Sequence, residues 1–213
     1  MLLGAKQFFM QDSKLKQIDG IMISGRWFST GISGSDASHS LEVEADVIMF
    51  DIKAGGEFDF LGNFDGNRVS RALMMGLFGT SAYISAYIYV AGANRATSLG
   101  SLPIGVPVRY RAYIDYDSGA FNVGINDSSV SGTVSLDEFS LGTYPFYIGA
   151  GNNYGYAACP AVIKEVKFTL DNVLVADYVP AYEGGRIGLR DIVRDTFNAD
   201  TAGFALPYIA SIQ

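Results

Sequence analysis

Two apolar-rich runs separated by a two-residue polar turn constrain the fold of this chain more than any other feature. The runs cover residues 163–170 and 173–180, and Asp171 and Asn172 stand between them. Short runs that flank a polar pair in this way predict a β-hairpin. Asp and Asn tolerate the positive φ that such a turn requires. Pro180 has no N–H group for a ladder, so we expect the second strand to end there.

Alternation of apolar and polar residues predicts further strands along the rest of the chain. From residue 41 to residue 50, apolar residues alternate with the acids Glu42, Glu44 and Asp46. Further strands are expected over residues 57–63, 71–79, 82–90, 106–115, 120–125, 130–134 and 144–150, after a first one within 18–32. No segment shows the helical pattern that a parallel α/β fold needs. Many short strands with frequent turns predict an all-β, two-sheet antiparallel sandwich.

The length of the chain fits one such domain. It has 213 residues, which is ordinary for a single all-β sandwich and short for two domains. We place this domain at residues 18–213 and an N-terminal arm at residues 1–17. The arm does not read as strand, and it carries the apolar residues Phe8 and Phe9. It is expected to pack on its own sandwich or on a neighbouring subunit, and we favour the contact between subunits.

Charge and composition exclude several classes of function. The formal net charge of −7 argues against a nucleic-acid partner and against an anionic membrane surface. No apolar run approaches the roughly 18 residues of a membrane span. Cys159 is the only cysteine and His39 the only histidine. These counts exclude an intrachain disulfide, a two-histidine metal site and most hydrolase triads.

The first ten residues, Met1 to Met10, lack the basic start, the long apolar stretch and the cleavage site of a signal peptide. The protein is therefore expected to be made in a cytosol. A virion protein released by lysis fits that history. A conventionally secreted lectin would need a signal that this sequence does not show.

The segment after the predicted hairpin carries a resemblance to a known family. Asp177, Val179, Pro180 and Ala181 are followed by Gly188-Leu189-x-Asp191 and by Phe197. This order resembles the closing segment of concanavalin A-like lectin/glucanase (LamG-like) jelly-roll domains, and Thr30-Gly31-Ile32 matches the end of their first strand. The variety that it resembles is common in bacteriophage virion proteins and in surface proteins of gut bacteria.

The resemblance implies a concanavalin A-like jelly roll and a non-enzymatic bacteriophage structural protein, such as a head-decoration, tail or fibre component. It would act in the virion, with other virion proteins or further copies of itself as partners and a host surface glycan as a candidate ligand. The first alternative is a carbohydrate-binding module on a bacterial cell surface. The second is a laminarinase-like glycoside hydrolase.

The hydrolase alternative depends on Glu42, Glu44 and Asp46, which share one face of a strand. Laminarinase-type enzymes carry a Glu-x-Asp-x-x-Glu strand, and here the last Glu would fall at Val47. The same acids are expected on the solvated face of any amphipathic strand. We therefore predict no catalytic residue and no enzyme activity.

Candidate ligand-binding residues lie at two places. The loop at residues 151–156 contains two amides and two aromatic rings: Asn152, Asn153, Tyr154 and Tyr156. Amides can bind sugar hydroxyls and rings can stack on sugar faces, although an ordinary Gly/Asn-rich turn has the same composition. Trp27, the single tryptophan, is a further stacking candidate, while strand tryptophans commonly serve in packing.

The remaining candidates lead to no assignment. Tyr83, Tyr87 and Tyr89 share a face that would suit a binding platform, a subunit contact or the half-buried side of a sandwich. Calcium is compatible with the fold, with ligands at Asp65 and Asn67 or at Asp115 and Asp117. Neither spacing is diagnostic, so no metal and no other cofactor is predicted.

Overall fold

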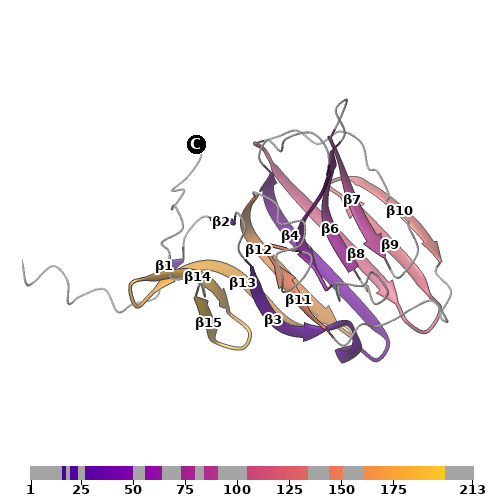
Figure 1. Ribbon diagram of the computed structural model, residues 1–213. Helices are drawn as coiled ribbons and strands as arrows, with labels where there is room; N and C mark the ends of the chain where they lie inside the picture. The colour runs from indigo at the N-terminus through magenta and orange to yellow at the C-terminus, as the bar shows by residue number, and fades with distance from the viewer. Residues whose placement is uncertain are drawn as a thin grey trace, which may run out of the picture.

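The computed structural model describes residues 16–17, 20–23, 27–49, 56–63, 73–79, 84–90, 105–133, 144–150 and 161–199. These residues form two antiparallel sheets that lie face to face (Figure 1). The one helical element among them is a short 3-10 turn, η1 (Gly34–Asp36). No helix in these segments is long and apolar enough to cross a membrane. The predicted all-β, two-sheet jelly-roll sandwich is confirmed.

The larger sheet contains ten strands. Along its main path they are β10 (Ser128–Thr133), β9 (Ala120–Ile125), β8 (Pro107–Asp115), β4 (Ser40–Met49), β12 (Ala161–Leu170), β13 (Val173–Glu183), β14 (Arg186–Asp191) and β15 (Thr196–Ala199). Two short strands join this path from the side. These are β1 (Lys16–Gln17), which pairs with β13, and β2 (Ile21–Ile23), which pairs with β12.

The smaller sheet contains five strands. Their order is β3 (Phe28–Ser33), β11 (Pro145–Ile148), β5 (Gly56–Gly62), β6 (Leu73–Gly79) and β7 (Ile84–Val90). Most predicted strands agree with the observed ones within a few residues. The segment 18–32, expected to hold one strand, instead contributes β2 to the larger sheet and β3 to the smaller.

The hairpin between β12 and β13 forms as predicted at its turn. Asp171 and Asn172 both have positive φ, at 50° and 65°, which is the geometry of a tight two-residue hairpin turn. The Asp171 carboxylate also accepts the backbone N–H groups of Ser38, His39 and Ser40. This carboxylate therefore ties the turn to the segment that leads into β4.

The prediction that the second strand ends at Pro180 is wrong, because β13 continues to Glu183. The ladder between β12 and β13 ends at the pair Val166–Tyr178, so Pro180 loses no bond to β12. Beyond it, β1 takes up that side of β13 at Ala181. The expectation that residues 1–17 hold no strand is likewise wrong at Lys16 and Gln17, while residues 1–15 lie outside the described residues.

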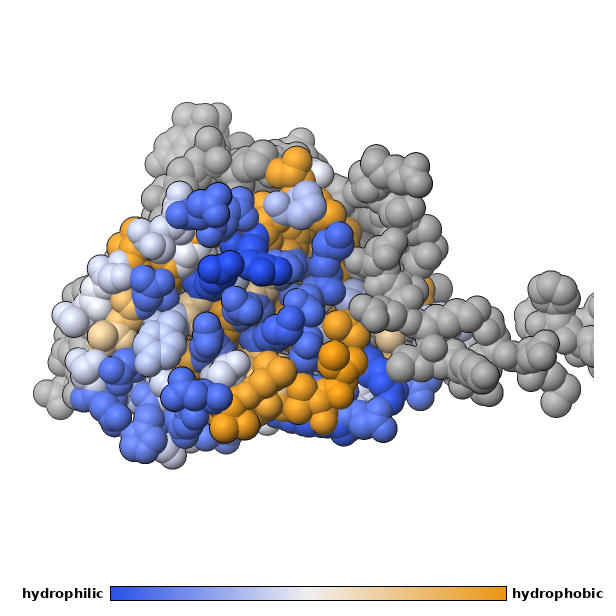
Figure 2. Space-filling view, turned by 180° about the vertical axis from the view of Figure 1, so that it is seen from behind, coloured by the Kyte–Doolittle hydropathy of each residue, from blue (hydrophilic) through white to orange (hydrophobic). Residues whose placement is uncertain are grey.

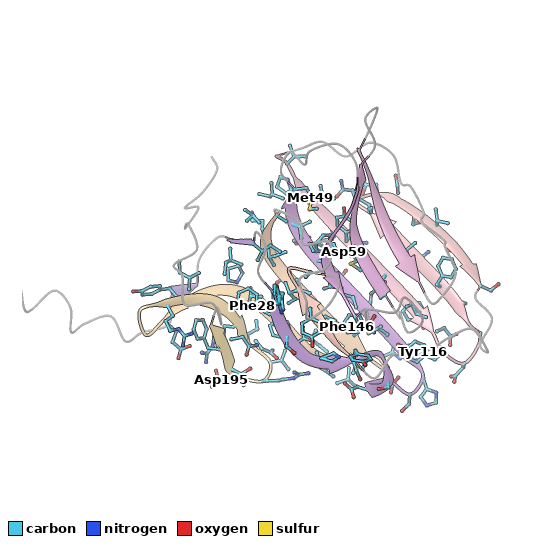
Figure 3. All side chains as sticks on the ribbon, in the orientation of Figure 1. Phe28, Met49, Asp59, Tyr116, Phe146 and Asp195 are labelled. Carbon is cyan, nitrogen blue, oxygen red and sulfur yellow. The ribbon has the colours of Figure 1, made fainter. Side chains whose placement is uncertain are left out.

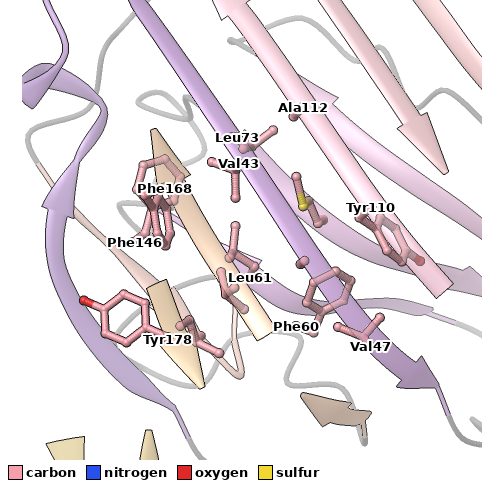
Figure 4. Packing of buried hydrophobic residues seen from close by; sticks show 14 of the residues in the cluster. Val43, Val47, Phe60, Leu61, Leu73, Tyr110, Ala112, Phe146, Phe168 and Tyr178 are labelled. Carbon is pink, nitrogen blue, oxygen red and sulfur yellow. The ribbon is translucent and has the colours of Figure 1, made fainter. Parts of the chain in front are cut away.

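The core lies between the two sheets and is rich in aromatic side chains (Figure 4). Phe60 packs edge-on against Tyr110 with ring centroids 4.8 Å apart. Phe168 lies 5.2 Å from Phe146 and 6.2 Å from Tyr178, again between ring centroids. All five are almost completely buried, and burial of this much apolar area is the main source of stability.

Two buried tyrosine hydroxyls connect the sheets across this core. Tyr110 of β8 donates to the carbonyl of Gly76 in β6 at 3.2 Å. Tyr178 of β13 donates to the carbonyl of Thr30 in β3 at 2.8 Å. Burial raises the pKa of Tyr178 to about 12. Each buried hydroxyl group thus has a hydrogen-bond partner, and each of these bonds fixes the position of one sheet against the other.

Candidate functional site

The outer face of the ten-stranded sheet carries a set of charged side chains. In β4 the side chains of Val43, Ala45 and Val47 are buried, whereas those of Glu42, Glu44 and Asp46 are only half-buried. The alternation predicted from the sequence is therefore confirmed, with the acids pointing away from the core. Figure 2 shows a broad hydrophilic field on this face, which lies at the back of Figure 1.

Two arginines of β8 neutralise two of these acids. The Arg109 guanidinium donates to both oxygens of Asp46, at 2.7 and 2.6 Å, and these hydrogen bonds hold the pKa of Asp46 below its usual value. Arg111 Nε lies 3.3 Å from a carboxylate oxygen of Glu44. Register places each pair directly opposite across the β4–β8 ladder.

The charged rows continue onto β12 and β13. Lys167 lies opposite Glu44 on one side and Asp177 on the other. Its Nζ is 2.7 Å from Glu165 and 3.9 Å from Asp177. Asp177 is 6% exposed, and burial raises its pKa, with Lys167 acting in the opposite direction. Acidic and basic side chains therefore alternate across β8, β4, β12 and β13 on this face.

One row of this face differs because an exposed aromatic ring replaces the charged pairs. Register aligns Asn122 of β9, Tyr113 of β8, Glu42 of β4 and Thr169 of β12 across four strands; we call these residues the Tyr113 row. Tyr113 is 38% exposed. Glu42 has no ion-pair partner among the residues that the structure describes. An open ring flanked by a carboxylate, an amide and a hydroxyl can stack on a sugar and bind its hydroxyls.

The same geometry bears on the hydrolase alternative. A glycosidase acid needs a raised pKa beside a second carboxylate. Asp46 shows the opposite shift, and both Asp46 and Glu44 are occupied by arginines. These acids have the environment of a solvated, ion-paired face, which is the simpler of the two interpretations that the alternation allows.

Trp27 lies elsewhere, immediately before β3 of the smaller sheet, and it is half-buried. Phe28 pairs with Ile148 of β11, so Trp27 stands beside the end of β11. The loop at residues 151–156 begins two residues after that strand and lies outside the described residues, as do Asn152, Asn153, Tyr154 and Tyr156. The structure therefore places Trp27 and leaves the loop residues as predictions.

The structure describes only some of the other candidates. The side chains of Tyr83, Tyr87 and Tyr89, and residues Asp65, Asn67 and Cys159, lie outside the described residues. The Asp115 carboxylate accepts the backbone N–H groups of Asp117 and Ser118, and Asp117 pairs with His39. Among the described residues, no group of three or more His, Cys, Asp or Glu side chains could hold a metal ion.

Sequence reasoning missed Tyr113, Arg109 and Arg111. A signal for them existed, because the three alternate with the buried Tyr110 and Ala112 along β8. Their importance depends on β8 lying beside β4, which places each residue opposite an acid. Strand order across such a sheet is not readable from alternation, so the constellation could not be assembled from the sequence.

The residues that carry the family resemblance serve the architecture of the β13–β15 region. The Asp191 carboxylate accepts the backbone N–H groups of Asp177, Val193 and Arg194 at 3.0 to 3.3 Å. Gly188 leaves room for Phe197, since a Cβ atom there would lie 2.8 Å from the Phe197 ring. These residues of the motif therefore support the fold of the β13–β15 region.

Comparison with known proteins supports the same conclusion about the fold. No protein-family model and no curated protein matches the sequence. A candidate carbohydrate-binding protein of Bacteroides ovatus has a similar structure, with a TM-score of 0.57 and 15% identity over 93% of this chain and 63% of that one. The chain thus spans less than two thirds of the length of that protein.

Weaker similarities extend to other β-sandwiches. Domain 4 of an extracellular arabinanase of Geobacillus stearothermophilus, solved with arabinotriose, gives a TM-score of 0.49 at 16% identity, over 74% of this chain and 75% of that one. A pentraxin of Limulus polyphemus gives 0.46 at 8% identity, over 71% and 70%. The fold shown is a two-sheet antiparallel β-sandwich, and none of these similarities carries a bacteriophage association.

Proposed function

We propose that this protein is a carbohydrate-binding module and that the Tyr113 row is its glycan-binding surface. The observation that carries the proposal is the exposed Tyr113 ring between Asn122 and Glu42, beside the ion pairs that Arg109 and Arg111 form with β4. Sugars present an apolar ring face and a rim of hydroxyls, and this row offers a partner to each. The fold shared with a candidate carbohydrate-binding protein of Bacteroides ovatus supports the choice of ligand class.

The module is proposed to bind without catalysis. Two of the three acids on the outer face of β4, Glu44 and Asp46, are held by arginines, and a lowered pKa makes Asp46 a poor proton donor at neutral pH. A bacterial cell surface is the proposed place of action. The virion role implied by the resemblance gains no support from the residues that carry it, since these residues build the β13–β15 region.

The test is a binding measurement on a panel of arabinotriose, cellohexaose, laminarihexaose, xylohexaose and sialyllactose. Tyr113→Ala is expected to weaken the binding of the retained sugar at least tenfold, about 1.4 kcal/mol. Tyr144→Ala is the matched control, because Tyr144 is a tyrosine of similar exposure, 45%, at the entry to β11. The Tyr144→Ala variant should bind the sugar with the same affinity as the parent protein.

Three results would contradict the proposal. Failure of every sugar in the panel to bind would argue against a carbohydrate-binding module. Loss of binding in Trp27→Ala together with full binding in Tyr113→Ala would move the site to the end of β11. Hydrolysis of any sugar in the panel would refute the non-catalytic role.

A further inference from the structure

The Tyr113 row continues onto one further strand at each of its ends. On β10, Ser131 pairs with Asn122 of β9. On β13, Leu174 pairs with Thr169 of β12. Residues that stand opposite each other in neighbouring strands face the same side of a sheet, so both additions lie on the outer face. We call the resulting set the extended row: Ser131, Asn122, Tyr113, Glu42, Thr169 and Leu174.

The extended row is long compared with one sugar. It crosses the six neighbouring strands from β10 to β13 (Figure 1), and because neighbouring strands lie about 4.8 Å apart, the row measures about 24 Å. In Figure 3 the label of Tyr116 marks the end of β8, near which the row crosses this strand at Tyr113. One sugar unit covers roughly one strand spacing, so the row has room for about five sugars in line. A single sugar on Tyr113 would leave most of the row uncovered.

The chemical groups along the extended row suit several sugars in line. Tyr113, 38% exposed, and Leu174, 43% exposed, offer apolar surface to the faces of sugar rings at two separate places. At the other end the Asn122 side-chain amide donates to Ser131 Oγ at 2.7 Å, which holds both polar groups in the row. None of the six side chains forms an ion pair with a residue that the structure describes. A ligand therefore reaches them without displacing a charged partner.

Both ends of the extended row are open among the described strands. β10 is the last strand on its side of the sheet, and Ser131 is exposed. At the other end the ladder between β13 and β14 begins only at Tyr178, so no strand of the described sheet stands beside Leu174 on its outer side. A site that recognises the end of a sugar chain needs groups that stop the chain. A row that is open at both ends lets the chain pass through.

We propose that the extended row binds the interior of a linear glycan, with the sugar chain running across the strands and with Ser131 and Leu174 as the outermost contacts. This inference rests on the proposed function, and it names the ligand class as an unbranched polysaccharide in place of a terminal sugar. Because each further sugar lies over a further strand, affinity should increase with chain length until about five units fill the row.

The first test is a calorimetric titration with unbranched oligosaccharides of increasing length, from the disaccharide to the hexasaccharide, built from the sugar that the panel retains. The hexasaccharide should bind roughly tenfold or more tightly than the disaccharide. Reduction of its terminal aldehyde to an alcohol opens the last ring and should change the affinity less than about threefold. Equal affinity for the two lengths would overturn the proposal. Loss of binding on reduction would also overturn it, because the protein would then recognise a chain end.

The second test places the chain on the sheet. Leu174→Ala should weaken the binding of the hexasaccharide about fourfold, the effect of losing roughly one methylene-sized contact. It should leave the disaccharide, held at Tyr113, unaffected. Val173→Ala is the matched control, because Val173 is the next residue, is 62% exposed and pairs with Leu170, in register with the core-facing side of β4. An unchanged hexasaccharide affinity in Leu174→Ala would overturn the proposal, and so would an equal loss for the disaccharide.

Failure of this inference and failure of the proposed function give different results. If no sugar in the panel binds, both fail. If Tyr113→Ala weakens binding while affinity does not change with chain length, the glycan site stands and the interior of a chain is not its ligand. Retention of sialyllactose alone would have the same meaning, because that ligand is too short to cross the extended row.

Discussion

The two faces of strand β4 differ in role: the inner face stabilises the fold, and the outer face forms part of the proposed recognition surface. On the inner face, Leu41, Val43 and Val47 are completely buried against the smaller sheet. On the outer face, Glu44 and Asp46 meet arginines that remain about half exposed. Buried apolar groups each contribute a kilocalorie or more, while exposed ion pairs contribute about 0.2–1 kcal/mol. The inner face therefore maintains the fold, and the outer face can change its chemistry at little cost.

The largest effect is expected from Phe168→Ala on the inner face. Phe168 is completely buried and contacts Phe146 and Tyr178, so its loss should lower the free energy of unfolding by about 3–5 kcal/mol. Urea denaturation measures this. Thr169→Ala, one residue on and facing outward, should stay within about 0.5 kcal/mol of the parent. Equal losses of stability in Phe168→Ala and Thr169→Ala would show that the inner and outer faces do not differ in this way.

A smaller loss of stability is expected where a buried carboxyl group supports a turn. Asp191→Ala removes the acceptor of three backbone N–H groups and should cost about 2–3 kcal/mol. Asp191→Asn keeps one amide oxygen as an acceptor and should recover part of that loss. A stability equal to that of the parent in Asp191→Ala would contradict the role assigned to the resemblance motif.

Removal of an outer-face ion pair should have a still smaller effect. Arg109→Ala breaks the two hydrogen bonds to Asp46, and because the pair is partly solvated the cost should be about 0.2–1 kcal/mol. Urea denaturation at low and high salt checks this, since screening should reduce the difference. A loss above about 2 kcal/mol would show that the outer face also maintains the fold.

The smallest effect is a pH dependence with opposite signs at two aspartates. Burial raises the folded pKa of Asp177, so stability should increase as the pH falls from 7 through that pKa. Arg109 lowers the folded pKa of Asp46, so its contribution is present above the unfolded value of about 3.9 and is lost below it. Thermal melts from pH 7 down to pH 2 cover both changes.

The substitution Asp177→Asn provides the control for that pH effect. The variant removes the titrating carboxyl group and keeps the shape of the side chain, so the rise in melting temperature towards pH 4 should be reduced. An unchanged pH profile in the variant would assign the effect to another group.

The comparison of the two faces also explains what the sequence could predict. Alternation in β4 and β8 and the Asp171-Asn172 turn depend on neighbouring residues, and both were predictable. The prediction that the strand ends at Pro180 was wrong because the end of the strand depended on where β12 stops pairing with β13. The Tyr113 row joins residues 42, 113, 122 and 169, and its assembly depends on strand order. The predicted loop residues at 152–156 remain predictions.

The most direct test of the account is an amide chemical-shift titration of the labelled protein with the sugar that binds best in the panel. Ring stacking on Tyr113 should shift the signals of residues 42, 113, 122 and 169 most, with residues 27, 149 and 150 unaffected. Shifts confined to residues 27, 149 and 150 would contradict the central claim. They would place the glycan at the end of β11 in the smaller sheet.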